Sequence, residues 1–212
     1  MANELYLLSG LGADNRVFDF LDLHGFKLIH IDWITPLESE KIESYARRLL
    51  DQIKSTRPTL IGVSFGGIIA IEIAKLIETN KVILVSSATT IADIPVHYRL
   101  AGKLRINKLI PASLYKKANF VVYWLFGVKK KKEKELLKAI MDDADNHFVA
   151  WATNKIAGWD NEQMLHNAVT IHGTADRVLP FKKADYVVHD GGHLMIVTKA
   201  DEVSRILRKV LE

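Results

Sequence analysis

Ser64 lies in a glycine-flanked segment whose residue types and spacing suit nucleophilic chemistry. The segment, Gly62-Val63-Ser64-Phe65-Gly66, joins an apolar run at 60–63 to an apolar stretch at 68–77. Such a segment between a strand and a helix holds the serine in a tight, strained turn, so the residues two positions away must lack bulk. The turn would expose the serine hydroxyl and aim the Phe65 amide at an oxyanion formed there. Alone, the pattern also fits an ordinary glycine-rich turn.

A serine hydroxyl is a poor nucleophile near neutral pH, so it needs a base, and histidine has a suitable pKa. The chain has eight histidines. Only His193 lies in a Gly-Gly-His-Leu segment directly between the last apolar run and the last amphipathic stretch. We predict that His193 is the base. His172, at the end of the apolar run at 168–171, is interpreted as structural, and the other six histidines have no motif around them.

The base in turn needs a carboxylate that holds its tautomer and stabilises the imidazolium. Asp176 stands in His172-Gly173-Thr174-Ala175-Asp176, directly after the apolar run at 168–171. Two rivals stay open at this point. Asp93 follows the apolar run at 81–85, and Asp190 lies only three residues from His193. We favour Asp176 because a loop after a neighbouring strand can reach the imidazole.

Short apolar runs rich in Ile, Val, Leu and Tyr predict the strands that position these residues. Helical periodicity at 42–53 and 203–211 predicts helices between and after them, and Thr198 with Asp201 resembles an N-cap for the last one. Strands that are apolar throughout and alternate with helices indicate a mainly parallel sheet in a three-layer α/β/α fold. The six predicted strands are 5–8, 27–31, 60–63, 81–85, 168–171 and 186–188.

One long gap interrupts this alternation. Residues 89–165 separate the fourth and fifth predicted strands and contain helical patterns at 100–126 and 133–156. We expect a single domain over residues 1–212, with 89–165 as a helical cap insertion. Its lysine run at 129–132 is interpreted as a solvated helix start.

Composition argues against a nucleic-acid-binding, a disulfide-bonded and a membrane-anchored protein. The chain has 212 residues, 49% of them hydrophobic, and 29 basic against 25 acidic residues give a net charge of +4 that does not indicate nucleic-acid binding. It has no cysteine, which excludes disulfides and thiolate chemistry. The sequence shows no signal-peptide pattern, and its longest apolar stretch, 120–128, is nine residues long. We therefore expect a cytoplasmic protein without a membrane anchor.

Together these motifs resemble the α/β-hydrolase superfamily over nearly the whole chain, and the chain order Ser64, Asp176, His193 is the order of that family. The resemblance implies a six-stranded sheet in the order 2-1-3-4-5-6, because the sequence starts at what resembles the family's third strand. It also implies that Ser9-Gly10-Leu11-Gly12 replaces the family's His-Gly loop. The amide of Leu11 would then complete an oxyanion hole with that of Phe65.

By this resemblance the chain is expected to be a small serine esterase that cleaves a small-molecule ester or thioester through an acyl-enzyme, without cofactor or metal. Trp33, Tyr98 and Trp124 are expected to contribute to the substrate site. The oligomeric state is left open.

Three other interpretations compete with this one. Gly10-Leu11-Gly12 with Asp32 resembles a dinucleotide-binding fingerprint, although Asn15 occupies its third glycine position. A non-catalytic binding protein could also use this fold. Acidic residues at 142–145 with His147 could suggest a metal site, but a solvated helix face explains them better.

Overall fold

The computed structural model describes residues 4–103 and 118–212, with backbone alone at 101–103. Its strands are β1 (Glu4–Leu8), β2 (Lys27–His30), β3 (Thr59–Val63), β4 (Lys81–Val85), β5 (Ala168–Gly173) and β6 (Tyr186–Val188). Its α-helices are α1 (Ile42–Leu49), α2 (Phe65–Ala74), α3 (Val96–Lys103), α5 (Phe120–Phe126), α6 (Lys131–Asp143), α7 (Asn146–Gly158), α8 (Met195–Thr198) and α9 (Ala200–Leu211). Three short 3₁₀ helices are Asn15–Val17, Leu50–Gln52 and Ile91–Asp93.

All six strands form one parallel sheet in the order β2-β1-β3-β4-β5-β6. This confirms the predicted fold class and strand order. The order reverses direction at β1, so the loops after β1 and β3 start side by side at the carboxyl edge of the sheet, where α/β proteins bind ligands.

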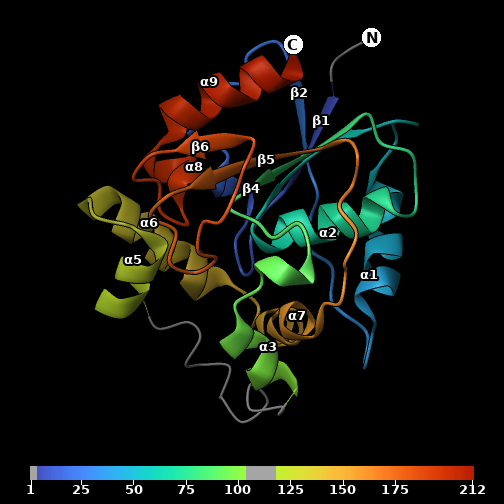
Figure 1. Cartoon of the computed structure of the whole chain (residues 1–212), viewed down its shortest axis with the longest axis horizontal. Helices are drawn as coiled ribbons and strands as arrows, with labels where there is room; N and C mark the ends of the chain where they lie inside the picture. Colours follow the sequence, from blue (N-terminus) through green and yellow to red (C-terminus); the bar gives the residue numbers. More distant parts are fainter. Residues whose placement is uncertain (1–3, 104–117) are drawn as a thin grey trace.

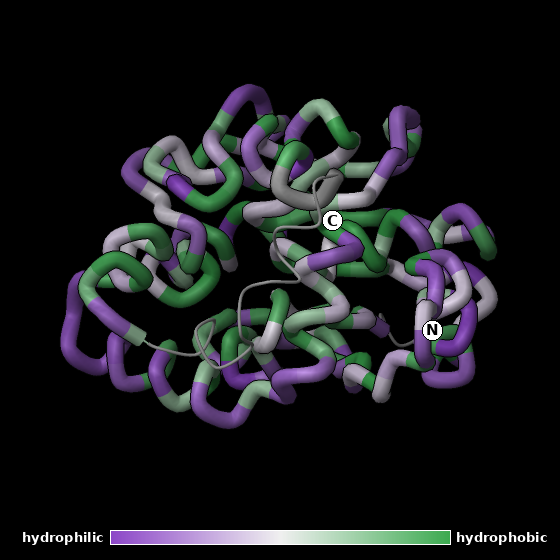
Figure 2. Tube along the Cα trace, turned by 90° about the horizontal axis from the view of Figure 1, so that it is seen from below, coloured by the Kyte–Doolittle hydropathy of each residue, from purple (hydrophilic) through white to green (hydrophobic). Residues whose placement is uncertain are grey.

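The sheet is buried on both faces because successive side chains of each strand point to opposite sides. Tyr6 and Leu8 pack in one core with α1 and α2. Leu5 and Leu7 pack in the other core with α8 and α9. Figure 1 shows these helix pairs on opposite sides of the sheet, and Figure 2 shows apolar segments gathered inside the fold with polar turns around it.

The α-helices that the structure describes within residues 89–165 are α3, α5, α6 and α7, here called the insertion helices. Figure 1 shows α5 and α6 at the left of the molecule and α3 and α7 below the sheet. Gly12, in the loop after β1, packs against them at the carboxyl edge of the sheet. A Cβ added there would lie 3.1 Å from Val149 of α7 and 3.2 Å from Ala144, which follows α6. Lys129–Lys132 are exposed at the start of α6. The part of the expected helical segment 100–126 that falls at 104–117 lies outside the described residues.

Two local predictions were wrong. The helical pattern at 133–156 is broken, because the Asp145 carboxylate accepts a hydrogen bond from the Phe148 amide and begins a new helix, α7. Thr198 is not the N-cap of the last helix, because it ends α8. Lys199 occupies that position, without a side-chain capping bond.

In the described part of the chain, no helix has both the length and the apolar character that crossing a membrane requires.

Candidate active site

Ser64 forms the turn between β3 and α2. Its backbone has φ 52° and ψ −117°, a strained combination for a residue with a side chain. The two flanking glycines are required sterically. A Cβ at Gly62 would lie 2.5 Å from backbone atoms of Gly66 and Gly67, and one at Gly66 would lie 2.2 Å from the Leu8 oxygen. Only hydrogen atoms fit there, so the turn can close tightly.

The structure brings Ser64, His193 and Asp176 into one hydrogen-bonded chain. His193 Nε2 lies 2.9 Å from Ser64 Oγ, and His193 Nδ1 lies 2.8 Å from Asp176 Oδ2. A carboxylate only accepts, so Nδ1 carries the proton and the Nε2 lone pair accepts the Ser64 hydroxyl. This is the arrangement in which an imidazole can remove the serine proton.

Asp176 is the most constrained of the three. Its side chain is fully buried, and its Oδ1 accepts hydrogen bonds from the Val178 and Leu179 amides at 2.9 Å. Burial alone would raise the pKa of the Asp176 carboxyl. The charge of His193 and the hydrogen bonds from both imidazoles and the Leu179 amide outweigh that effect and hold the pKa well below its ordinary value. The group therefore stays a carboxylate.

The C-terminal end of α5 supports the loop that carries His193. The Leu194 amide donates to the Phe126 oxygen at 3.1 Å, and the Phe126 ring meets the His193 ring edge-on at 5.4 Å. A Cβ at Gly192 would lie 2.7 Å from the Gly127 Cα, so the two backbones touch. An insertion helix thus packs directly against the imidazole.

The two residues predicted to form an oxyanion hole, Leu11 and Phe65, follow the neighbouring strands β1 and β3. Phe65 begins α2, so its amide has no partner within the helix and benefits from the positive end of the helix dipole. Leu11 lies in the loop after β1, which is held by hydrogen bonds from Ser9 Oγ and the Ala13 amide to its own carbonyls. Among the described residues, neither amide donates to a protein acceptor. The role of both residues stays a prediction.

Comparison with known proteins agrees with this architecture. No protein-family model and no curated protein matches the sequence. Among solved structures, an enol-lactonase from Burkholderia xenovorans has a TM-score of 0.72 at 19% identity, covering 100% of this chain and 92% of its own. An esterase from Exiguobacterium antarcticum has a TM-score of 0.70 at 16% identity, covering 99% and 92%. A bromoperoxidase from Bacillus anthracis has a TM-score of 0.71 at 16% identity, covering 100% and 92%.

The chain has the α/β-hydrolase fold. In this fold the nucleophile follows a central strand and the acid and base follow later ones. Here Ser64 follows β3, Asp176 follows β5 and His193 follows β6, so each residue that we predicted stands at its expected place in the α/β-hydrolase sheet. Their catalytic roles remain predictions.

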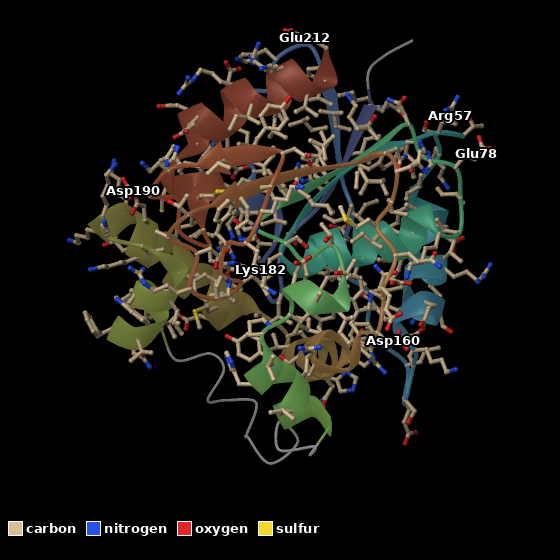
Figure 3. All side chains as sticks on the ribbon, in the orientation of Figure 1. Arg57, Glu78, Asp160, Lys182, Asp190 and Glu212 are labelled. Carbon is tan, nitrogen blue, oxygen red and sulfur yellow. The ribbon has the colours of Figure 1, made fainter. Side chains whose placement is uncertain are left out.

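The rival acids lie elsewhere in this α/β-hydrolase fold. The Asp93 carboxylate accepts hydrogen bonds from the Thr89 and Thr90 amides and caps a 3₁₀ helix. Asp190 is exposed, and Figure 3 shows it at the edge of the molecule. Asp176 is thus the carboxylate that meets the His193 imidazole.

The three expected substrate-site residues have different surroundings. Trp33 stacks on Phe148 at 5.3 Å and lines a cavity of about 220 Å³ beside the loop after β1. Tyr98 is half-buried, and burial together with the negative charge of Asp176 raises its pKa. Trp124 is 51% exposed, stacks against the Arg177 guanidinium and does not line this cavity. Any contact of these residues with substrate stays a prediction.

The alternative sites gain no support. The turn after β1 leads into the three-residue 3₁₀ helix Asn15–Val17, which is too short to supply the helix N-terminus that a dinucleotide pyrophosphate needs. Within residues 4–103 and 118–212, no group of three His, Cys, Asp or Glu side chains could hold a metal ion. Asp143 pairs with Arg16, and Asp145 caps α7.

Sequence reasoning missed several residues that shape the site. Ser87 Oγ donates to the Ser64 oxygen at 2.7 Å and ties the turn to β4. Phe126 packs on His193, and His172 contacts Asp176. The sequence did offer a signal for Ser87. The pair Ser86-Ser87 directly follows the buried strand β4, and polar residues in that position lie at the same sheet edge as Ser64. The Phe126 contact spans distant segments and had no local signal.

Proposed function

We propose that the chain is a serine hydrolase that cleaves a carboxylic ester of a small molecule through an acyl-enzyme. The observation that carries this proposal is the hydrogen-bonded chain from Ser64 through His193 to buried Asp176, placed at a strained turn. The fold supports it, since solved structures that share it include esterases and a lactonase.

In the proposed reaction Ser64 Oγ attacks the ester carbonyl while His193 Nε2 takes the hydroxyl proton. The amides of Leu11 and Phe65 bind the resulting oxyanion, which costs no reorganisation because backbone groups are already fixed. The tetrahedral intermediate expels the alcohol, which takes the proton from His193. A water molecule then gives its proton to His193, attacks the acyl-enzyme carbonyl and releases the carboxylic acid, returning the proton to Ser64.

Labelling with a fluorophosphonate probe tests the proposal without knowledge of the substrate. We expect one covalent adduct per chain, mapped to the peptide containing Ser64, and none in Ser64→Ala. Turnover of a small activated ester should fall roughly 10⁴-fold or more in that variant. Ser44→Ala is the matched control, because Ser44 is exposed on α1.

The other interpretations predict different outcomes. A non-catalytic binding protein would leave the probe unreacted, and a dinucleotide-binding protein would bind NAD tightly without labelling. Near-normal ester turnover in Ser64→Ala would show that another group is the nucleophile.

A further inference from the structure

His172 is a buried histidine that the proposed reaction does not use. It lies in β5 and is 8% exposed. Its Nε2 lies 2.8 Å from the Leu179 oxygen and 3.3 Å from Asp176 Oδ2. A carbonyl oxygen only accepts, so Nε2 carries a proton, and the same N–H faces the carboxylate. Asp176 is therefore shared by two imidazoles.

This second imidazole completes the surroundings of the Asp176 carboxylate. Oδ1 accepts from two backbone amides, and Oδ2 accepts from His193 Nδ1 at 2.8 Å and faces His172 Nε2 at 3.3 Å. A carboxylate offers about four lone-pair sites, so all of them are used. Without His172, Oδ2 would face His193 alone and would attract positive charge on that ring more strongly.

We propose that His172 is a positioning residue that, by sharing Asp176 Oδ2, weakens the carboxylate's hold on protonated His193 and extends the action of His193 as a base to lower pH. This inference rests on the proposed function, in which His193 is the base. Protonation of His172 acts in the same direction, because a positive charge beside Asp176 opposes a second one on His193.

The groups around His172 allow it to carry a proton. Burial lowers the pKa of His172, but its hydrogen bond to Asp176 and the charge of that group raise the pKa above its ordinary value, with a smaller contribution from Asp93. The Phe181 ring packs against the imidazole at 6.1 Å and is neutral. Burial and the negative charge of Asp176 raise the pKa of half-buried Tyr98. Among the residues that the structure describes, His193 is the other imidazole that contacts Asp176, and its protonation opposes that of His172.

The test is the pH profile of fluorophosphonate labelling in three variants. His172→Phe removes the N–H donor and the charge, whereas His172→Gln removes the charge and retains an amide donor. His189→Gln is the matched control, because His189 is exposed directly after β6. We expect the midpoint of the acid limb to rise by roughly half a pH unit or more in His172→Phe, by less in His172→Gln, and not at all in the control.

A merely structural role gives another result. Labelling of the folded His172→Phe protein would then fall by the same factor at every pH, and the midpoint would stay at the wild-type value. That outcome would overturn the inference. Thermal unfolding of each variant shows whether it is folded.

A measurement on the ¹⁵N imidazole resonances separates this inference from the proposed function and needs no variant of His172. We expect His172 to be protonated at Nε2, and we expect it to lose its second proton at lower pH in Asp176→Asn than in the wild type. An unchanged His172 titration would refute the sharing even if Ser64 is labelled. If the probe fails to label the wild type, the proposed function fails, and the ¹⁵N titration still decides whether His172 and Asp176 are coupled.

Discussion

Replacing Gly66 with alanine tests how tightly the turn at Ser64 is packed. The added Cβ would lie 2.2 Å from the Leu8 oxygen and 2.3 Å from the Ser9 oxygen, whereas real Cβ contacts essentially never fall below 3.0 Å. Both neighbours are backbone atoms, so no side chain can rotate away. Either α2 or the end of β1 must shift by roughly 1 Å, and overpacking of this kind costs about 1–3 kcal/mol.

Because the clash is with backbone atoms, we expect Gly66→Ala to lose about 3 kcal/mol of unfolding free energy, the upper end of that range. Alanine's higher helix propensity offsets about 1 kcal/mol of this loss. The net loss of about 2 kcal/mol lowers Tm by roughly 4–8 °C for a chain of this length. The shift also moves the backbone that leads to Leu11, so we expect fluorophosphonate labelling to slow by at least about tenfold.

Gly158→Ala provides the matched control, because Gly158 ends α7 and a Cβ there meets nothing within 4 Å. Its Tm should stay constant or rise by a few degrees, as helix propensity dictates. Thermal unfolding followed by circular dichroism measures both variants. If Gly66→Ala melts within about 2 °C of the wild type and is labelled at the wild-type rate, the steric reasoning for the turn is refuted.

Two further predictions concern buried carboxylates. Glu72 is 2% exposed and accepts a hydrogen bond from Trp159 Nε1 at 2.8 Å. Trp159→Phe removes this donor, so the unfolding free energy measured in urea should fall by about 1–3 kcal/mol. Fluorophosphonate labelling at low temperature should change little. An unchanged urea midpoint would contradict this prediction. The lowered pKa of Asp176 means that its charge stabilises the fold above about pH 4, and this contribution is lost as the pH falls through the lowered value. The difference in unfolding free energy between the wild type and Asp176→Asn should therefore shrink from pH 5 to pH 3, and a constant difference would count against the assignment.

Much of the fold was predictable because its signals are local. The central strands are continuous apolar runs, a pattern typical of a sheet buried on both faces. The predicted first and last residues of each strand lie within two residues of the observed ones. The turn at Ser64 was predictable because sterics demand glycine at 62 and 66. Asp176 and His193 were predictable because each follows a strand whose end must lie at the same edge as that of β3.

What escaped prediction depends on contacts that sequence spacing does not report. The break between α6 and α7 was hidden because apolar periodicity continues on both sides of Asp145. The contact of His172 with Asp176 arises because two amides bind Asp176 Oδ1 and fold the loop so that the Leu179 oxygen returns to His172. His172 is held in β5, but an aspartate four residues later in a loop can take many positions relative to it, and this closed turn brings the two side chains together.

The spacing of the three predicted catalytic residues follows from the sheet rather than from the helices that cover it. The Ser64 amide donates to the Val85 oxygen of β4, and the Ser86 amide donates to the Ile171 oxygen of β5. The Ala175 amide then donates to the Gly191 oxygen, which joins the loop of Asp176 to that of His193. Adjacent loops are thus bonded in series, each to the next along the sheet edge. The distances between the three side chains are therefore determined mainly by neighbouring parallel strands, and α5 adds packing on the His193 ring.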